Sequence, residues 1–464
     1  MRVAAIDQGT TSTRCLVIGP GGDWRLAASR RHRQEHPQPG WVEHDPEELL
    51  ANIRAVLEAA GPVDRIALAN QGESCLAWDA ATGAPLSPVI VWQDARTASH
   101  LAAMPESAAA LSRRVSGLPL DSYFSASKLG WIVANLPAAA AAHAAGRLRL
   151  GTTDAFFLDR LTGRFVTDRA TASRTGLMDL RGGGWSEELC RLHGVPVDGL
   201  PEIVAVDAGF GAVDGTPVAV SIVDQQAALC GHGCHRPGDT KITFGTGAFL
   251  LSVTGDAPRA PAGLLPTVAW SRRDGGTVYA VEGGVYDAGA ALEWARRIGL
   301  YDRVEELNGF DGLPAIQRGL ACVPALSGLA APHWDRTAAP LMIGMDHATD
   351  RRDLVRAVLE GIALLTADLL ASLGEPPSRD GGISIDGGLA RNPYFAQFLA
   401  SACGREIVVP PMHELTALGL ARLCGLDVDG ARAGAARFEP DGSVGDGDRA
   451  LFAEAVARSR AWRR

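Results

Sequence analysis

Short apolar runs that end in polar, glycine-rich turns recur along this chain, and two of them share one plan. Residues 2–18 contain the runs VAAID and CLVI on either side of the turn QGTTSTR. Residues 240–253 repeat the plan with KITF, the turn GTG and AFLLSV. Apolar runs with β-branched residues around a glycine turn are typical of β-hairpins. We therefore predict one hairpin early in each half of the chain.

The remaining pattern predicts both strands and helices. Asp45 is followed by Pro46, Glu47 and Glu48, which is typical of a helix start. Asp is a favoured N-cap residue, Pro is common at the first helical position, and acidic residues are enriched in the first turn. Helical apolar spacing predicts a long buried helix over residues 352–373 and an amphipathic one over residues 446–464. Strands are predicted at residues 65–70 (RIALAN), 88–92 (PVIVW), 218–223 (VAVSIV) and 383–385 (ISI). This mixture indicates the α/β class.

The length of 464 residues is enough for two or three domains. Pro237 and Gly238 interrupt the pattern directly before the second hairpin. We therefore expect one domain over residues 1–235 and a second over residues 236–464.

Composition and charge exclude some classes of binding partner. Lys and Arg number 44 against 53 acidic residues, a net charge of −9, which argues against a general nucleic-acid binder. The alanine-rich stretch 136–148 is far shorter than the roughly 20 residues that a membrane span needs. The N-terminal residues reach the charged Asp7 and contain no apolar run long enough for the core of a signal peptide. The eight cysteines are scattered along the chain and do not indicate a disulfide framework. We expect a cytoplasmic protein without membrane insertion.

Three of the turns can hold phosphate. Residues 7–14 put hydroxyls, backbone amides and Arg14 around a turn, with Asp7 able to hold Mg²⁺ through water. The turns at residues 245–247 and 386–388, the latter followed by Asn392, are similar. Taken alone, such a turn fits a polar hairpin tip on the surface better than a phosphate site, and the chain has no Walker lysine loop. Together they suggest a nucleotide in a cleft between two domains.

Asp224 follows an apolar strand, where a carboxylate can act as a general base or begin a helix. Cys230, His232, Cys234 and His235 follow it at a spacing that matches no standard zinc site. We interpret these four residues as helix-end packing.

Eight motifs, in this order, resemble the FGGY family of carbohydrate kinases, and in particular its glycerol-phosphorylating members. The resemblance covers essentially the whole chain and rests on DQGTTSTR (7–14), PGWVEHDPEE (39–48), VWQDART (91–97), YFSASKLGWI (123–132), VDQQAALCG (223–231), FGTGAF (244–249), GLAAPHWD (328–335) and DGGLARN (386–392).

The resemblance implies two actin-like (RNase H-like) α/β domains with the active site in the cleft between them. It implies that ATP phosphates contact Thr10, Thr11, Ser12, Arg14 and Thr246, with Mg²⁺ near Asp7. The ADP and adenosine site would be lined by Gly289, Glu293, Gly388 and Asn392. The polyol would lie among Glu73, Trp92, Tyr123, Asp224, Gln225 and Phe249, with Asp224 as the base.

The implied activity is ATP-dependent phosphorylation of a primary hydroxyl of glycerol or a related polyol. The product would be glycerol 3-phosphate or the corresponding sugar-alcohol phosphate, together with ADP. A kinase of a longer polyol or ketose (erythritol, a pentitol, xylulose or ribulose) is the alternative. A remoter alternative is an actin-like or chaperone-like ATPase, which would not need the polyol residues. A homodimer and a homotetramer both remain open.

Three segments depart from the pattern of the resembling kinases. Gly72 stands where those acting on glycerol carry an arginine, so the pocket is either enlarged or completed by another group. Ala339-Pro340 replaces an Arg-Gly pair, to which we assign no consequence. The loop at residues 210–216 lacks basic residues that serve sugar-phosphate regulation in some relatives, so such regulation is not expected.

Overall fold

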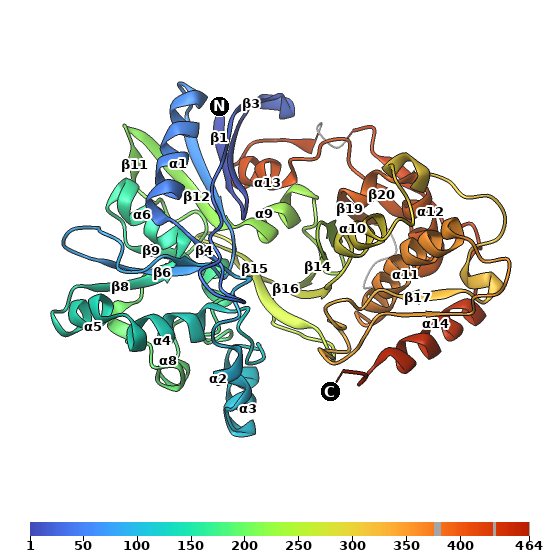
Figure 1. Ribbon diagram of the computed structural model, residues 1–464. Coiled ribbons are helices and arrows are strands. Elements are labelled where there is room, and N and C mark those ends of the chain that lie inside the picture. The colour runs from blue at the N-terminus through green and yellow to red at the C-terminus, as the bar shows by residue number, and fades with distance from the viewer. Residues whose placement is uncertain (375–381, 430–432, 464) are drawn as a thin grey trace.

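The computed structural model describes residues 1–374, 382–429 and 433–463. Two lobes lie side by side, the first built from the blue-to-green part of the chain and the second from the yellow-to-red part (Figure 1). Within the described residues, no helix combines the length and apolarity that a bilayer crossing requires.

The first lobe contains a six-stranded sheet with the order β11-β12-β5-β1-β2-β3. Strand β1 is antiparallel to β2 and parallel to β5, and β5 is parallel to β12. The strands are β1 (Val3–Gln8), β2 (Ser12–Ile18), β3 (Trp24–Arg31), β5 (Arg65–Asn70), β11 (Ala212–Val213) and β12 (Thr216–Val223). Their buried side chains pack with helices α1 (Pro46–Ala60) and α6 (Thr153–Thr162) in one apolar cluster.

A smaller four-stranded sheet with the order β4-β7-β6-β8 extends this lobe. Trp92 follows one of its strands closely, and the helix that begins just after Tyr123 packs against this sheet. Its strands are β4 (Glu43–His44), β6 (Cys75–Asp79), β7 (Val89–Ile90) and β8 (Leu148–Thr152). The helices of this region are α2 (Ala98–Ala102), α3 (Glu106–Val115), α4 (Ser125–Asn135), α5 (Pro137–Ala144), α7 (Arg169–Ser173) and α8 (Glu187–His193), and β9 (Val166–Asp168) pairs with β10 (Glu202–Val204).

The second lobe contains a seven-stranded sheet with the order β15-β16-β14-β13-β19-β20-β21. Its strands are β13 (Thr240–Phe244), β14 (Ala248–Gly255), β15 (Leu265–Arg272), β16 (Gly276–Val285), β19 (Ile383–Gly387), β20 (Ile407–Val409) and β21 (Ala436–Phe438). A separate pair is formed by β17 (Ala321–Val323) and β18 (Leu341–Ile343). The helices are α10 (Gly289–Arg297), α11 (Arg351–Ala371), α12 (Pro393–Cys403), α13 (Leu415–Leu423) and α14 (Asp446–Ser459).

The two large sheets repeat one topology. In β3-β2-β1-β5-β12 and in β16-β14-β13-β19-β20, the first three strands are antiparallel neighbours and the last three are parallel. The two predicted hairpins are β1–β2 and β13–β14, the equivalent strands of the two sheets. The predicted α/β class with two related domains is therefore confirmed.

Two helices join the lobes at a crossing made of glycines. A Cβ atom on Gly231 of α9 (Asp224–Gly231) would lie 1.9 Å from the Leu415 carbonyl oxygen. A Cβ atom on Gly419 of α13 would lie 1.8 Å from the Ala227 carbonyl oxygen. Backbone contact this close requires the absence of a side chain on each helix. An apolar cluster around the crossing includes residues of both sheets and so connects the lobes.

The predicted elements differ from the observed ones mainly at their ends. The Asp45 carboxylate accepts a hydrogen bond from the Glu47 amide and caps α1 as expected. The predicted strand at residues 88–92 is only the short β7, and the predicted last helix ends at Ser459 instead of continuing to residue 464, which lies outside the described residues. The helix predicted at residues 352–373 is α11.

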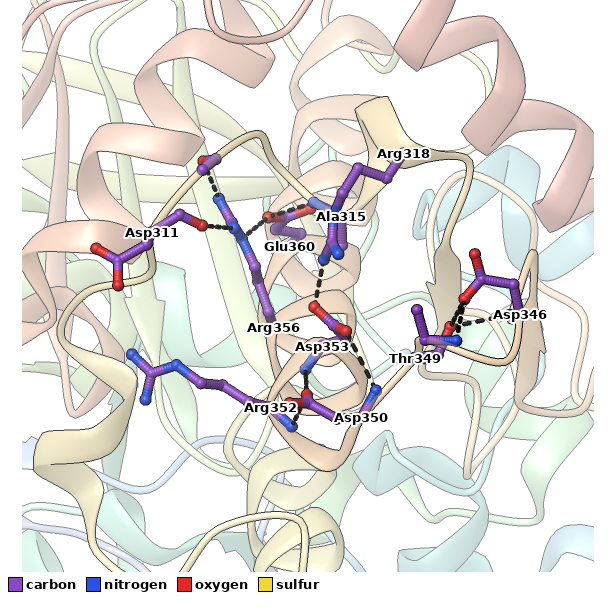
Figure 2. A network of polar contacts seen from close by, with 12 residues as sticks. Asp311, Ala315, Arg318, Asp346, Thr349, Asp350, Arg352, Asp353, Arg356 and Glu360 are labelled. Atoms are coloured by element: carbon purple, nitrogen blue, oxygen red, sulfur yellow. Dashed lines mark hydrogen bonds and ion pairs between the residues drawn. The ribbon is translucent and has the colours of Figure 1, made fainter.

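The start of α11 is held by polar contacts (Figure 2). Asp350 caps the helix by accepting hydrogen bonds from the Arg352 and Asp353 amides. One turn further, the buried Arg356 and Glu360 form an ion pair with Nε and Oε1 2.9 Å apart. The Glu360 carboxylate also accepts from the Ala315 amide, so this network fixes the preceding loop against the helix.

Candidate active site

The β1–β2 turn places its polar groups at the junction of the lobes. The Gly9 amide donates to the Ser12 carbonyl oxygen at 3.0 Å and closes the turn. Thr10 is held from two sides, because His32 Nε2 lies 2.8 Å from its carbonyl oxygen and Trp92 Nε1 donates to its Oγ1 at 3.0 Å. Thr11 is exposed and Ser12 half-buried. This turn therefore borders the cavity described below.

Arg14 and Asp7 face the second lobe. Arg14 Nη1 pairs with Glu414 Oε1 at 3.1 Å, and Glu414 lies directly before α13. Burial and the nearby Glu414 charge raise the pKa of Asp7 to about 6, although Arg14 opposes the shift. An additional positive charge at this position would favour the ionised form of Asp7.

A cavity of about 100 Å³ lies beside this turn, between the lobes. All six residues that the sequence assigned to the polyol line it, and so does Gly72. The Trp92 ring meets the rings of Tyr123 and Phe249 edge-on, with centroids 5.6 and 6.5 Å apart. The further lining residues, which the sequence reasoning did not single out for this cavity, are Thr10, Gln71, Arg174, Val223, Gln226 and Glu282.

A charged triad crosses the floor of this cavity. Arg174, only 2 % exposed, pairs through Nε with Glu73 Oε1 and through Nη2 with Glu282 Oε2, each at 2.7 Å. Burial raises the pKa of Glu73, with Arg174 opposing the shift. Because Glu282 is on β16, the triad connects the two lobes. Arg174 and Glu282 could have been found from the sequence, because each is a charged residue within a stretch of apolar or small residues.

Gly72 lies against Val223 rather than against open space. A Cβ atom on Gly72 would stand 2.9 Å from Val223 Cγ2, closer than such contacts normally come. The following Glu73 adopts a left-handed backbone, with φ at 57°. The Val223 side chain therefore occupies the side of the cavity on which residue 72 would carry a side chain.

Asp224 and Gln225 begin α9 at the end of β12. Val223 is the capping residue, so Asp224 is the first helical residue rather than the cap. Its carboxylate accepts from the Gln225 amide at 2.6 Å. Burial, followed by the charges of Asp7 and Glu73, raises the pKa of Asp224 to about 8. A strand-end carboxylate with a raised pKa inside a cavity is suited to accept a proton near neutral pH.

The second lobe brings its own turns together. The Gly289 amide donates to the Gly245 carbonyl oxygen at 3.0 Å, and the Ala288 and Ala290 amides donate to the Thr246 carbonyl oxygen. The Gly388 amide donates to the Phe244 carbonyl oxygen at 3.0 Å. The predicted residues Thr246, Gly289 and Gly388 therefore gather around the end of β13.

Two other predicted nucleotide residues are engaged within the protein. The Asn392 side chain caps α12 by accepting from the Phe395 amide and donates to the Leu307 carbonyl oxygen. Glu293 is largely exposed and pairs with Arg296 one turn along α10. Asn392 therefore holds the loop before α12, and Glu293 stands on the surface of α10.

Comparison with known proteins places this geometry in a family. Residues 2–231 match the N-terminal domain of the FGGY family of carbohydrate kinases, and residues 240–427 match its C-terminal domain. The chain is 41 % identical to a glycerol kinase of Aromatoleum aromaticum over 91 % of this chain and 89 % of that one. It is 39 % identical to a glycerol kinase of Gloeobacter violaceus over 99 % and 97 %.

Solved structures agree with the sequence comparison. The Plasmodium falciparum glycerol kinase with ADP superimposes with a TM-score of 0.89 at 29 % identity, covering 99 % of this chain and 98 % of that one. The Lactobacillus acidophilus xylulose kinase shares the fold at 20 % identity, with a TM-score of 0.84 over 99 % and 96 % of the two chains. This chain belongs to the FGGY family of carbohydrate kinases and is a phosphotransferase with an alcohol group as acceptor.

Proposed function

We propose that the protein phosphorylates a primary hydroxyl of glycerol with ATP, giving glycerol 3-phosphate and ADP. The observation that carries the proposal is the small cavity in which Glu73, Asp224 and Gln225 meet beside the β1–β2 turn. Its polar groups suit hydroxyls, and its aromatic wall suits the carbon edge of a polyol. In this proposal residues 1–235 carry most of the polyol and phosphate site, and residues 236–464 carry the adenine-nucleotide site.

Asp224 acts as the general base of the proposed reaction. The substrate oxygen attacks the γ-phosphorus while the bond from that phosphorus to the β,γ-bridging oxygen breaks. The hydroxyl proton passes to the Asp224 carboxylate, and ADP leaves. Phosphoryl transfer depends mainly on positioning and on neutralising charge, and both are supplied by groups fixed at strand ends.

The nucleotide phosphates would lie between the turns of the two lobes. Thr10, Thr11, Ser12 and Arg14 approach them from the first lobe, and Thr246 approaches them from the second. Arg14 would exchange its contact with Glu414 for a phosphate oxygen. The adenosine would lie beside a wall made of Gly289, Glu293, Gly388 and Asn392.

Asp7 is the protein ligand proposed for Mg²⁺. Proteins bind Mg²⁺ with one or two carboxylates and leave the other positions to phosphates and water. Asp7 offers one carboxylate of this kind at the junction of the lobes, and the described residues contain no cluster of three or more His, Cys, Asp or Glu side chains that would hold a metal by protein ligands alone. When bound, Mg²⁺ would neutralise phosphate charge.

The shape of the cavity beside Gly72 supports glycerol as the substrate rather than a longer polyol or a ketose. Val223 Cγ2 lies 2.9 Å from the place of a Cβ on Gly72, so a missing side chain does not leave an open extension there. Arg174 holds Glu73 within the same cavity and supplies the guanidinium that residue 72 does not. The two relatives that are 41 % and 39 % identical to this chain are glycerol kinases.

A substrate panel tests this proposal. ADP release would be measured with glycerol, erythritol, the pentitols, xylulose and ribulose at equal enzyme and MgATP concentrations. We expect the highest kcat/KM with glycerol. A higher kcat/KM with any of the longer substrates would overturn the assignment of glycerol while leaving the kinase class intact.

A further inference from the structure

Lys241 is a buried lysine on β13, beneath the polyol cavity. Its side chain is 0 % exposed, and Nζ donates to Gln225 Oε1 at 2.5 Å and to Thr243 Oγ1 at 3.0 Å. Lys241 takes part in no ion pair of the described residues, but the charges of Asp386, Asp224 and Glu282 favour its ammonium form. Burial lowers the pKa of Lys241, since a low-dielectric surrounding disfavours the charged form.

The contact with Lys241 determines how the Gln225 amide is turned. A lysine ammonium has donors only, so the amide atom facing Nζ must be the oxygen. The NH₂ group of Gln225 is therefore directed away from Lys241. Gln225 lines the polyol cavity, and no group in the described residues accepts a hydrogen bond from its Nε2.

A donor at this position complements the neighbouring carboxylates. Glu73 and Asp224 line the same cavity, and an ionised carboxylate only accepts hydrogen bonds. A hydroxyl both donates and accepts, so it is fully satisfied between a carboxylate and an NH₂ group. An inverted Gln225 amide would present a third acceptor and would remove the donor that Gln225 offers to the lone pairs of a substrate hydroxyl.

We propose that Lys241 is a positioning residue that fixes the Gln225 amide with its NH₂ group toward the polyol. The inference rests on the proposed function. It assigns a substrate-orienting role to a strand of the second lobe, because β13 carries Lys241 while Gln225 begins the helix that follows the first sheet. Lys241 thus connects the strand that ends at the Thr246 turn with the polyol cavity.

A double-mutant cycle with Lys241→Met and Gln225→Ala tests this role. If Lys241 acts through Gln225, their effects are not additive, as for any pair in direct contact. We expect Lys241→Met to lower kcat/KM for glycerol about 10-fold or more in the parent chain and less than about 2-fold in the Gln225→Ala background. Equal losses in the two backgrounds would overturn the proposal.

Lys128 offers a matched control for removing a buried ammonium. It is also 0 % exposed, and its Nζ donates to the Val91 and Tyr123 carbonyl oxygens and not to Gln225. The effect of Lys128→Met should therefore be the same in both Gln225 backgrounds. Non-additivity as large as that of Lys241→Met would contradict a specific action through Gln225.

A second variant covers the case in which Lys241→Met does not fold. Gln225→Glu keeps Lys241 and its partner oxygen but offers no NH₂ group to the substrate. We expect KM for glycerol to rise about 10-fold or more, while KM for ATP stays within about 2-fold. A change of this size is usual when a hydrogen bond is lost and its partner group is left unpaired. An unchanged KM for glycerol would overturn the proposal. If the parent enzyme lacks activity with glycerol altogether, the proposed function fails instead, and the same cycle is measured with the polyol that the panel identifies.

Discussion

Single residues carry the chemistry of this site because the surrounding fold changes their ionisation and orientation. Asp224 is half-buried, and desolvation together with the charges of Asp7 and Glu73 raises its pKa to about 8. Arg174 and Lys241 are both buried, yet they act differently, since Arg174 pairs with two carboxylates and Lys241 pairs with an amide and a hydroxyl. The motifs predicted Asp224, but Arg174 and Lys241 acquire partners only through the fold.

Replacing Asp224 with asparagine should remove the base and preserve the shape of the cavity. General-base catalysis is worth about 100- to 10,000-fold, and we expect a loss of kcat in this range. Binding of ATP, measured by calorimetry, should change little because Asp224 is not among the residues proposed to hold the nucleotide. A kcat within about 3-fold of the parent value would remove Asp224 from the role of base.

The raised pKa of Asp224 predicts how activity depends on pH. The base must be ionised, so activity is present above its pKa and lost as the pH falls through about 8. An ordinary aspartate would lose activity only near pH 4, about its unperturbed pKa. The measurement is kcat/KM for glycerol against pH at low MgATP. A profile that stays flat from about pH 5 to 9 would show that the surroundings do not raise the pKa.

Among the helices and strands, the sequence pattern predicted the features that depend only on residues close together in the chain. The cap at Asp45 and the strand at residues 65–70 appear where predicted. The crossing of α9 and α13 could not be predicted, because it joins segments that are far apart in the chain. Its requirement for Gly231 and Gly419 is visible only once both backbones are placed.

Gly419→Ala tests this crossing. The added Cβ would meet the Ala227 carbonyl oxygen at 1.8 Å, so the helices must separate. We expect the free energy of unfolding to fall by about 1–3 kcal/mol, as for other overpacked sites. Chemical denaturation measures the change.

Gly447→Ala is the matched control for that substitution. Gly447 lies in α14, and a Cβ there would meet nothing within 4 Å. The control should be neutral or gain about 0.5–1 kcal/mol from helix propensity. If Gly419→Ala is as stable as the parent, the close crossing is wrong.

The network at the start of α11 gives a second prediction at this scale (Figure 2). Glu360→Gln leaves the buried Arg356 without a carboxylate, and breaking a buried pair costs about 3–5 kcal/mol. The exposed pair of Arg458 and Glu454 has the same spacing in α14, so Glu454→Gln is the control and should change stability by less than about 0.5 kcal/mol. Similar losses in both variants, measured by denaturation, would contradict the account of this network.

At the scale of the whole molecule, two related sheets put their hairpin turns on opposite sides of one site. The cavity takes Asp224 from the first lobe and Phe249 and Glu282 from the second, so the site requires both lobes. The paired hairpin patterns predicted the repeat. The distances across the junction depend on the packing of both lobes, which the sequence pattern does not contain.

The proposed reaction of this site is the transfer of the γ-phosphoryl group of ATP to a polyol hydroxyl. The most direct test is ³¹P NMR of the enzyme with MgATP, in the presence and absence of glycerol. We predict that a phosphate ester of glycerol accumulates in step with ADP, and that little inorganic phosphate forms. Inorganic phosphate appearing in step with ADP, whether or not glycerol is present, would identify an ATPase and contradict phosphoryl transfer to a polyol.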